Sequence, residues 1–158
     1  MQNIFSSPVG DLIIRIVNDK LAGLEYLSSS YQNLEDSFSV SHTALLTEVK
    51  KQLQHYFANP KYHFSLPIEL TGTELQRKIW QELQLIESGQ VITYGDLAKK
   101  LNTGPRIIGN ACRRNPIAII VPCHRVVGVN GLCGYSGQTE GKLFDVKKWL
   151  LDYEEAKA

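Results

Sequence analysis

A cysteine and a histidine stand next to each other at Cys123 and His124, directly after an apolar run. The run Ile117–Val121 predicts a buried strand, and Pro122 ends its pairing just before the cysteine. A thiolate is a good nucleophile and a neutral thiol is a poor one, so chemistry at Cys123 needs a base or a cation nearby. In an extended segment neighbouring side chains point to opposite faces, and His124 would then take the thiol proton through a bridging water. Taken alone, this dipeptide favours a structural cysteine over a nucleophile.

A second group of residues has the spacing of a nucleic-acid-binding helix. Pro105 suits the first position of a helix that we predict to end at Arg114, before Asn115-Pro116. Small, polar and basic residues lie at i, i+3, i+4 and i+7 on one face of this helix, namely Arg106, Gly109, Asn110 and Arg113. We expect the other face to be buried and to consist of Ile107, Ile108, Ala111 and Cys112. This pattern fits close approach to a DNA groove, and it fits an exposed, solvated face equally well.

The elements that must position these residues differ between the two halves of the chain. In the first half, β-branched runs and turn residues predict strands at 4–5, 12–17 and 21–27, followed by a helix at 41–59. In the second half, Thr73 and Gln76 are spaced as a capping box for a helix that Ser88-Gly89 ends. A short helix capped at Thr93 precedes the Pro105 helix, and the pair predicts a helix-turn-helix. A tail helix has its apolar side on Val146, Trp149, Leu150 and Tyr153, and we expect Trp149 and Leu150 to pack on the core.

These patterns predict an α+β protein of two domains. Residues 1–69 form a small antiparallel β-sheet with a helix and serve as a scaffold. Residues 70–158 form a mostly helical domain with the helix-turn-helix and the candidate cysteine. A chain of 158 residues can bury a core without disulfides or metals.

The composition limits the partners and the compartment. The net charge is only +1, so any DNA contact must come from a local group of lysines and arginines. No stretch resembles a signal peptide or approaches the roughly 20 apolar residues that span a membrane. We therefore expect a cytoplasmic protein, or a nuclear one in a eukaryote. The spacing of Cys112, Cys123 and Cys133 does not match paired metal ligands, so we expect no metal and no cofactor.

Several ordered motifs of the second half resemble one family. The stretch Val121-Pro122-Cys123-His124-Arg125-Val126-Val127-Gly128, preceded by Arg113-Arg114-Asn115-Pro116, resembles the active-site signature of the O6-alkylguanine-DNA alkyltransferases. The similarity runs from about Thr73 to Glu154 and includes Thr93-Tyr94-Gly95-Asp96-Leu97-Ala98, Gly134-Tyr135-Ser136-Gly137 and Lys147-Lys148-Trp149-Leu150-Leu151.

The resemblance implies a function and a role for each matching residue. It implies direct-reversal DNA repair, in which Cys123 takes the alkyl group from O6-alkylguanine in duplex DNA irreversibly, one lesion per protein. Asn115, His124 and Glu154 are implied to support Cys123, with Glu154 orienting His124. Tyr94 is implied to help rotate the nucleotide and to protonate the leaving guanine, and Arg106 to fill the gap left by the flipped base. The pocket is implied to be formed by Val126, Tyr135 and Ser136, and the first domain to have a ribonuclease H-like fold.

The resemblance also implies the mode of association and leaves some points open. The second helix of the helix-turn-helix, with Gly109, Asn110 and Arg113, is implied to bind the minor groove of double-stranded DNA. We expect a monomer in solution and leave open cooperative assembly on DNA and activity on O4-alkylthymine. Gln138 departs from a glycine common in the family, and Thr139–Phe144 is extra material, which affects substrate breadth rather than the reaction.

Three other functions compete with this interpretation. An alkyltransferase-like sensor would bind the lesion without reacting, but such proteins replace the acceptor cysteine, which is present here as Cys123. A thiol hydrolase with a Cys-His pair would turn over repeatedly and would need no helix-turn-helix. A transcription regulator would use the same DNA-binding unit, although the sequence contains no further effector domain.

Overall fold

The structure is a computed structural model that describes residues 3–27, 43–129 and 142–155. The chain divides into two compact units. The first unit consists of Met1–Thr71 together with Pro116–Ala118, and the second consists of Gly72–Asn115 and Ile119–Ala158. The short segment Pro116–Ala118 therefore belongs to the first unit, although its neighbours on both sides belong to the second.

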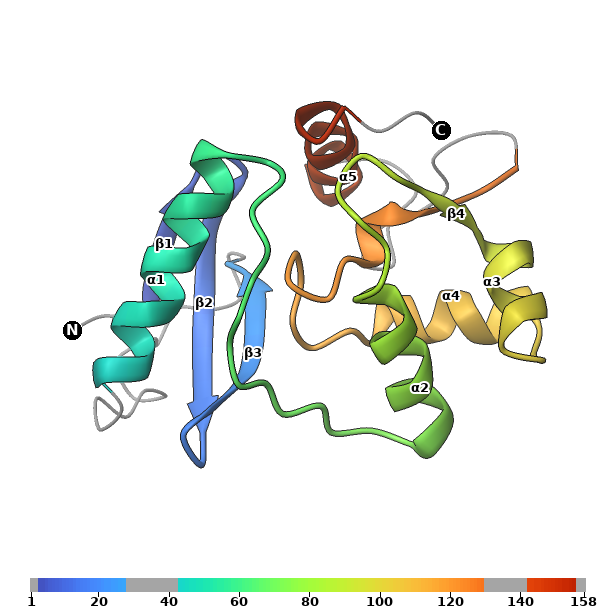
Figure 1. Cartoon of the computed structure of the whole chain (residues 1–158), viewed down its shortest axis with the longest axis horizontal. Coiled ribbons are helices and arrows are strands. Elements are labelled where there is room, and N and C mark those ends of the chain that lie inside the picture. Colours follow the sequence, from blue (N-terminus) through green and yellow to red (C-terminus); the bar gives the residue numbers. More distant parts are fainter. Residues whose placement is uncertain (1–2, 28–42, 130–141, 156–158) are drawn as a thin grey trace. The chain divides into compact units, whose positions relative to one another are not determined.

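The first unit contains a three-stranded antiparallel sheet in the order β1-β2-β3, formed by β1 (Ile4–Ser7), β2 (Gly10–Val17) and β3 (Lys20–Tyr26) (Figure 1). Asn18 and Asp19 connect β2 to β3 with φ angles of 53° and 59°. Two consecutive residues with positive φ form the tight hairpin turn whose twist matches that of the strands, and asparagine and aspartate tolerate this conformation. All three predicted strands are confirmed.

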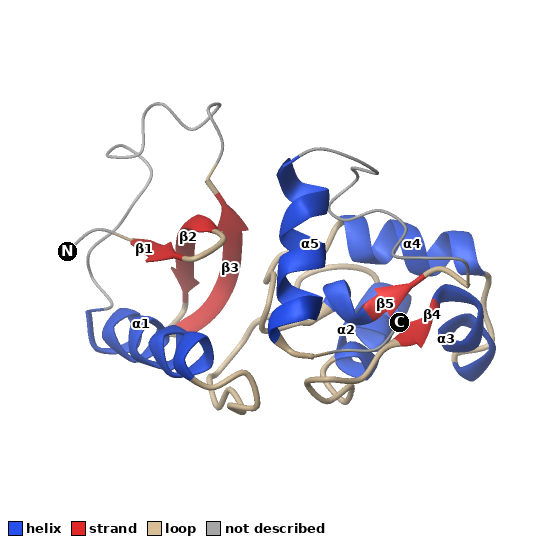
Figure 2. Cartoon of the chain, turned by 90° about the horizontal axis from the view of Figure 1, so that it is seen from above, coloured by secondary structure: helices blue, strands red, loops and turns tan. Residues whose placement is uncertain are grey.

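Helix α1 (Thr43–Ala58) contacts β2 and β3 and lies along one side of the sheet (Figure 2). Its buried residues Leu46, Val49, Leu53 and Tyr56 recur at helical spacing, and the strands contribute the buried residues Leu12, Ile14, Leu21 and Leu24. Two short extended segments also pair with β3. The N–H of Leu21 donates to the carbonyl of Pro67 at 2.8 Å, and the N–H of Leu24 donates to that of Pro116 at 2.9 Å.

The second unit is mostly helical, with α2 (Glu74–Leu83), α3 (Tyr94–Lys100), α4 (Pro105–Arg113) and α5 (Lys142–Tyr153). Two strands of two residues each, β4 (Ile92–Thr93) and β5 (Val126–Val127), pair in parallel beside these helices (Figure 2). The α+β class and the mostly helical second part are thus confirmed. No helix in the described ranges is long and apolar enough to cross a membrane.

The helix starts that the sequence predicts are confirmed. The Thr73 hydroxyl accepts from the N–H of Gln76 at 3.1 Å, and the Gln76 side chain accepts from the N–H of Thr73 at 3.0 Å, which is a complete capping box. The Thr93 hydroxyl accepts from the N–H of Asp96 at 3.1 Å at the start of α3. Caps depend on a few adjacent residues, so the local sequence predicts them well.

The predicted end of α2 is wrong. The helix ends at Leu83, and Gly89, with a φ of 90°, lies in a later turn rather than at the helix end. The Ile86 carbonyl accepts a hydrogen bond from Arg125, so the backbone there leaves the helix to meet a partner far away in sequence.

The predicted strand Ile117–Val121 is also wrong. Ile117 makes a single bridge to Leu24, and the chain then turns at 118–120, where Ile119 has a φ of 71°. The run is buried as expected, but apolar composition alone does not distinguish a buried strand from a buried turn. A positive φ in a β-branched residue is strained, and such strain is found most often at functional sites.

Candidate active site

Cys123 begins a 3-10 turn, Cys123–Arg125, that follows Pro122 and leads into β5. The turn is closed by the N–H of Val126, which donates to the Cys123 carbonyl. The cysteine is buried, with 4% of its surface exposed, and His124 is completely buried. The segment is not extended at these residues, because the chain turns here. The argument that their side chains must point to opposite faces does not apply.

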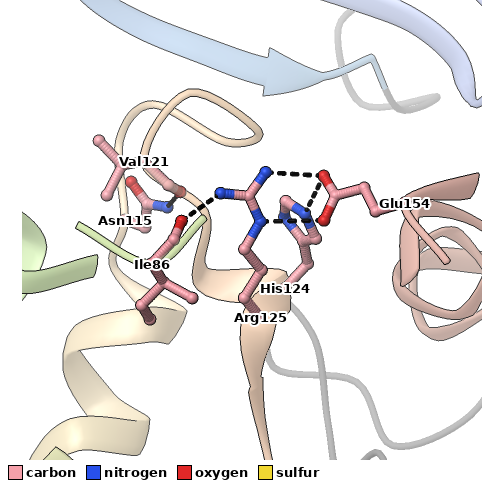
Figure 3. Close-up of polar contacts among 6 residues, drawn as sticks. All are labelled: Ile86, Asn115, Val121, His124, Arg125 and Glu154. Carbon is pink, nitrogen blue, oxygen red and sulfur yellow. Dashed lines mark hydrogen bonds and ion pairs between the residues drawn. The ribbon is translucent and has the colours of Figure 1, made fainter. Parts of the chain in front are cut away.

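The environment of Cys123 acts on its thiol in two opposed ways. Burial raises the pKa of Cys123, because a thiolate loses its hydration there. Hydrogen bonding from Asn115 and the positive charge of Lys147 lower it. Asn115 is held in place by its side-chain N–H, which donates to the Val121 carbonyl at 2.7 Å (Figure 3). Burial is the largest effect, so the resting cysteine is a thiol that must lose its proton during a reaction.

His124, Arg125 and Glu154 form a hydrogen-bonded cluster (Figure 3). The distance from His124 Nε2 to Glu154 Oε2 is 3.0 Å. Arg125 donates from Nε to Glu154 Oε1 and from Nη2 to Oε2, both at 2.9 Å, and from Nη1 to the Ile86 carbonyl. The guanidinium lies between the carboxylate and that carbonyl (Figure 3). Burial raises the pKa of Glu154, but the hydrogen bonds from His124 and Arg125 and the charge of Arg125 outweigh it, and this pKa is lowered to about 2.

The ionised Glu154 fixes the protonation of His124. A carboxylate only accepts, so His124 Nε2 must carry the hydrogen that lies between them. Burial lowers the pKa of His124, which keeps the ring neutral at pH 7. The neutral ring then has its lone pair on Nδ1, and this buried atom accepts no hydrogen bond from the described residues. His124 is thus a base oriented by a carboxylate, and its basic nitrogen is available for the proton of a nucleophile.

Helix α4 presents the predicted polar face to solvent. Arg106, Asn110 and Arg113 are exposed, and a Cβ added at Gly109 would meet nothing within 4 Å. Ile108, Ala111 and Cys112 are buried, but the prediction for Ile107 is wrong because 44% of its surface is exposed. One residue of helix turns the side chain by 100°, which places Ile107 at the edge of the buried face rather than on it. The exposed face of α4 is therefore basic, with the apolar side chains of Pro105 and Ile107 beside the arginines.

Tyr94 and Val126 lie on the two elements that pair beside the turn. Tyr94 is the first residue of α3 and is half-buried, and Val126 begins β5 and is buried. Thr93, immediately before Tyr94, is the register partner of Val127 in the parallel pair. The pairing of β4 with β5 thus places Tyr94, the residue after β4, beside the strand that follows the Cys123 turn. Tyr135 and Ser136, which the family resemblance assigns to the pocket, lie outside the described residues.

Two residues of this site have no role in the sequence analysis. Arg125 binds both oxygens of Glu154, and Lys147 is a completely buried lysine on α5. A signal for Lys147 exists in the sequence, because it lies three and four residues before the apolar Leu150 and Leu151 on a helix. The prediction that Trp149 packs on the core is wrong. It is 36% exposed and stacks on Tyr153, with ring centroids 5.0 Å apart.

The described residues contain no group of three histidine, cysteine or acidic side chains that could hold a metal ion. The arrangement combines a buried cysteine, a neutral histidine oriented by a carboxylate, and a basic helix face on the same unit.

Comparisons with known proteins agree along almost the whole chain. The family described as 6-O-methylguanine DNA methyltransferase matches twice, with its ribonuclease-like domain over residues 2–70 and its DNA binding domain over residues 74–156. A methylated-DNA–protein-cysteine methyltransferase of Bacillus subtilis is 37% identical over 156 residues, which cover 94% of each chain. The crystal structure of the O6-methylguanine methyltransferase of Mycobacterium tuberculosis superposes with a TM-score of 0.81 at 32% identity, covering 98% of this chain and 92% of that one. The same organism's protein in complex with DNA gives a TM-score of 0.79 at 32% identity, covering 97% and 92%. The chain belongs to the 6-O-methylguanine DNA methyltransferase family.

Proposed function

We propose that this protein repairs DNA by direct reversal, taking the methyl group of O6-methylguanine onto Cys123. The observation that carries the proposal is the buried Cys123 followed by His124, which Glu154 and Arg125 orient, in a chain that belongs to this family. Relatives named methylated-DNA–protein-cysteine methyltransferases support the reaction class, and a neighbour solved with DNA supports DNA as the partner.

The reaction displaces guanine from the methyl carbon. The thiol proton passes to His124 Nδ1 through a water molecule, and the sulfur forms a bond to the methyl carbon as the bond from that carbon to O6 breaks. The electron pair of the broken bond goes to guanine, which takes a proton from the Tyr94 hydroxyl, and the proton on His124 returns to the tyrosinate. The products are unmodified guanine and S-methylcysteine. A thioether has no route back to a thiol with the side chains of this site, so each molecule reacts once.

The target base must leave the duplex to reach a buried sulfur. Extrusion costs a few kcal/mol of stacking and pairing, and a side chain that fills the gap lowers this cost. Arg106 is the second residue of α4 and is exposed, so it is the candidate for this role. Asn110 and Arg113 follow on the same face toward the phosphates, and the absence of a side chain at Gly109 allows close approach.

We infer that the two domains have different functions. Residues 70–158 bind DNA and carry the chemistry, and residues 1–69 are the scaffold. We also infer that the carbonyls of Cys123 and Val126, with Tyr135 and Ser136, recognise the guanine edge. We also infer a monomer in solution, and the reaction needs no second copy because the proposed acceptor and the proposed base both lie on one chain.

Mass spectrometry of the intact protein and its peptides tests the proposed reaction. Incubation with DNA that carries O6-methylguanine is expected to add one methyl group, located on the peptide that contains Cys123. Cys123→Ala is expected to gain no mass, whereas Cys112→Ala, which removes another buried cysteine, is expected to react like the wild type.

Each rival function gives a different result in the same experiment. Tight binding of the lesion without a gain in mass would identify a sensor that does not react. Release of product in excess of protein would identify a hydrolase. Either result would overturn methyl transfer to Cys123.

A further inference from the structure

Lys147 is a lysine without exposed surface, on the buried face of α5. Lysine is almost never completely buried unless its ammonium group has partners. Its Nζ donates to the Val126 carbonyl at 2.6 Å and lies 5.7 Å from the centroid of the Tyr94 ring. The second distance is within the range in which a cation is attracted to an aromatic face. The ammonium group is therefore held at a fixed place by two residues of the candidate site.

This place is linked to Cys123 by the backbone. Val126 makes both connecting hydrogen bonds. Its carbonyl accepts from Lys147 Nζ, and its N–H donates to the Cys123 carbonyl. The 3-10 turn Cys123–Arg125 leads directly into Val126, so one short, hydrogen-bonded segment connects the residue that binds the ammonium to the residue that carries the sulfur. Burial raises the pKa of Cys123, and the charge of Lys147 acts against it and lowers this pKa. Burial is also the largest effect on His124, whose pKa it lowers, and the charge of Lys147 lowers it further.

We propose that Lys147 is a positioning residue for the methyl transfer, whose buried positive charge stabilises the Cys123 thiolate while its hydrogen bond holds the Val126 carbonyl in place. This inference rests on the proposed function for its substrate. A buried sulfur cannot rely on water to stabilise its negative charge, so a fixed cation has a larger effect here than on an exposed cysteine. The same cation helps keep His124 neutral and thus ready to accept a proton.

Two substitutions separate the charge of Lys147 from its hydrogen bond. Lys147→Gln removes the charge but keeps an N–H donor for Val126, and Lys147→Met removes both while filling the space. Lys147→Arg keeps the charge. The matched control is Lys148→Gln, which changes the exposed neighbouring lysine on the same helix.

Each variant is measured in two reactions, single-turnover methyl transfer from methylated DNA and alkylation of Cys123 by iodoacetamide, both at several pH values. We expect Lys147→Gln and Lys147→Met to slow both reactions by on the order of tenfold at pH 7.5, because one pKa unit changes the thiolate fraction tenfold. Lys147→Arg is expected to restore most of the rate, and Lys148→Gln to match the wild type.

Loosened packing would give the opposite result for iodoacetamide. If Lys147 only fills space, its replacement exposes Cys123, and iodoacetamide then reacts as fast as with the wild type or faster. That result would overturn the proposal, as would equal losses in Lys147→Arg and Lys147→Met. A wild-type protein that fails to take a methyl group from DNA would refute the proposed function, while the iodoacetamide comparison would still test Lys147.

Discussion

Glu154 orients the side chains of His124 and Arg125 in the candidate site. One carboxylate accepts from His124 and from two nitrogens of Arg125, all within the protein interior. Hydrogen bonds to charged groups are stronger than those between neutral groups, and leaving one buried partner unpaired is costly. Glu154 therefore affects both the basicity of His124 and the stability of the fold.

Replacing Glu154 by glutamine is expected to lower both activity and stability. The amide keeps one acceptor oxygen but presents an NH₂ group to the donors of Arg125 or His124. We expect methyl transfer to fall by on the order of 100-fold, the lower range for the loss of an oriented general base. We expect unfolding at pH 7 to become easier by about 3 kcal/mol, as when one partner of a buried ion pair is removed.

The stability difference is expected to depend on pH in a defined direction. The pKa of Glu154 is about 2 in the folded protein against an ordinary 4.5, so its carboxylate stabilises the fold fully above pH 4.5. This contribution is lost as the pH falls from 4.5 toward 2. Urea unfolding at pH 7, 4.5 and 3 should therefore show wild type and Glu154→Gln converging at low pH. The exposed Asp152→Asn on the same helix is the control, and a difference that stays constant with pH would contradict this account.

At the scale of elements, the sequence predicts the helix caps and helix starts, because these depend only on a few adjacent residues. The caps at Thr73 and Thr93 and the start of α4 at Pro105 are local, and all three are confirmed. The turn after Ile117 is not local, because the Ile117 segment pairs with β3 and its end is tied by Asn115 to Val121. An apolar run that is buried by distant partners carries no periodicity that would reveal a turn.

The same reasoning explains what was missed around the cysteine. The family resemblance implies that Glu154 orients His124, 30 residues earlier, although no periodicity of the sequence joins the two. The bonds from Arg125 to the same carboxylate follow neither from a pattern nor from the resemblance. The burial of Lys147 depends on the Val126 carbonyl, 21 residues earlier. Such pairs join different elements, so spacing along one helix or strand could not predict them.

Helix α4 allows a prediction that separates base flipping from chemistry. Arg106→Ala is expected to slow repair of duplex DNA at saturating concentration by about tenfold or more, because the energy of unstacking is a few kcal/mol and 1.4 kcal/mol is a factor of ten. Reaction with the free base O6-benzylguanine, which needs no flipping, is expected to stay unchanged. Single-turnover rates on both substrates measure this.

Arg113→Ala is the matched control on the same exposed face. It removes an equal charge and is expected to weaken DNA binding without slowing the step at saturation. Equal losses for Arg106→Ala on both substrates would show that Arg106 acts on the chemistry or the fold rather than on the flipped base.

At the scale of the whole molecule, the burial of the proposed acceptor, Cys123, connects the reaction to the stability of the fold. Cys123 is 4% exposed and is surrounded by buried residues, so a methyl group added to its sulfur must displace neighbours. Overpacking a core by one such group costs about 1 to 3 kcal/mol. The protein methylated at Cys123 is therefore expected to be less stable than the unmodified protein.

Thermal unfolding of methylated and unmodified protein measures this effect. We expect the methylated form to have a Tm lower by roughly 2 to 12 °C, given about 2 to 4 °C for each kcal/mol in a chain of this size. Protein incubated with the same DNA without the lesion is the control. Identical Tm values would mean that the site has room for the methyl group already.

The three residues Pro116–Ala118 affect how the first unit folds while the chain is being synthesised. They pair with β3 at Leu24, and they belong to the first unit, although most of the second unit's helices precede them in sequence. During synthesis β3 leaves the ribosome before α2, α3 and α4. Until residues 116–118 have followed these helices, the backbone N–H and carbonyl of Leu24 have no pairing partner on that segment. An unpaired strand edge is a template for pairing with other chains. The nascent protein therefore presents this unpaired edge to other chains in the interval between the emergence of β3 and that of residue 118.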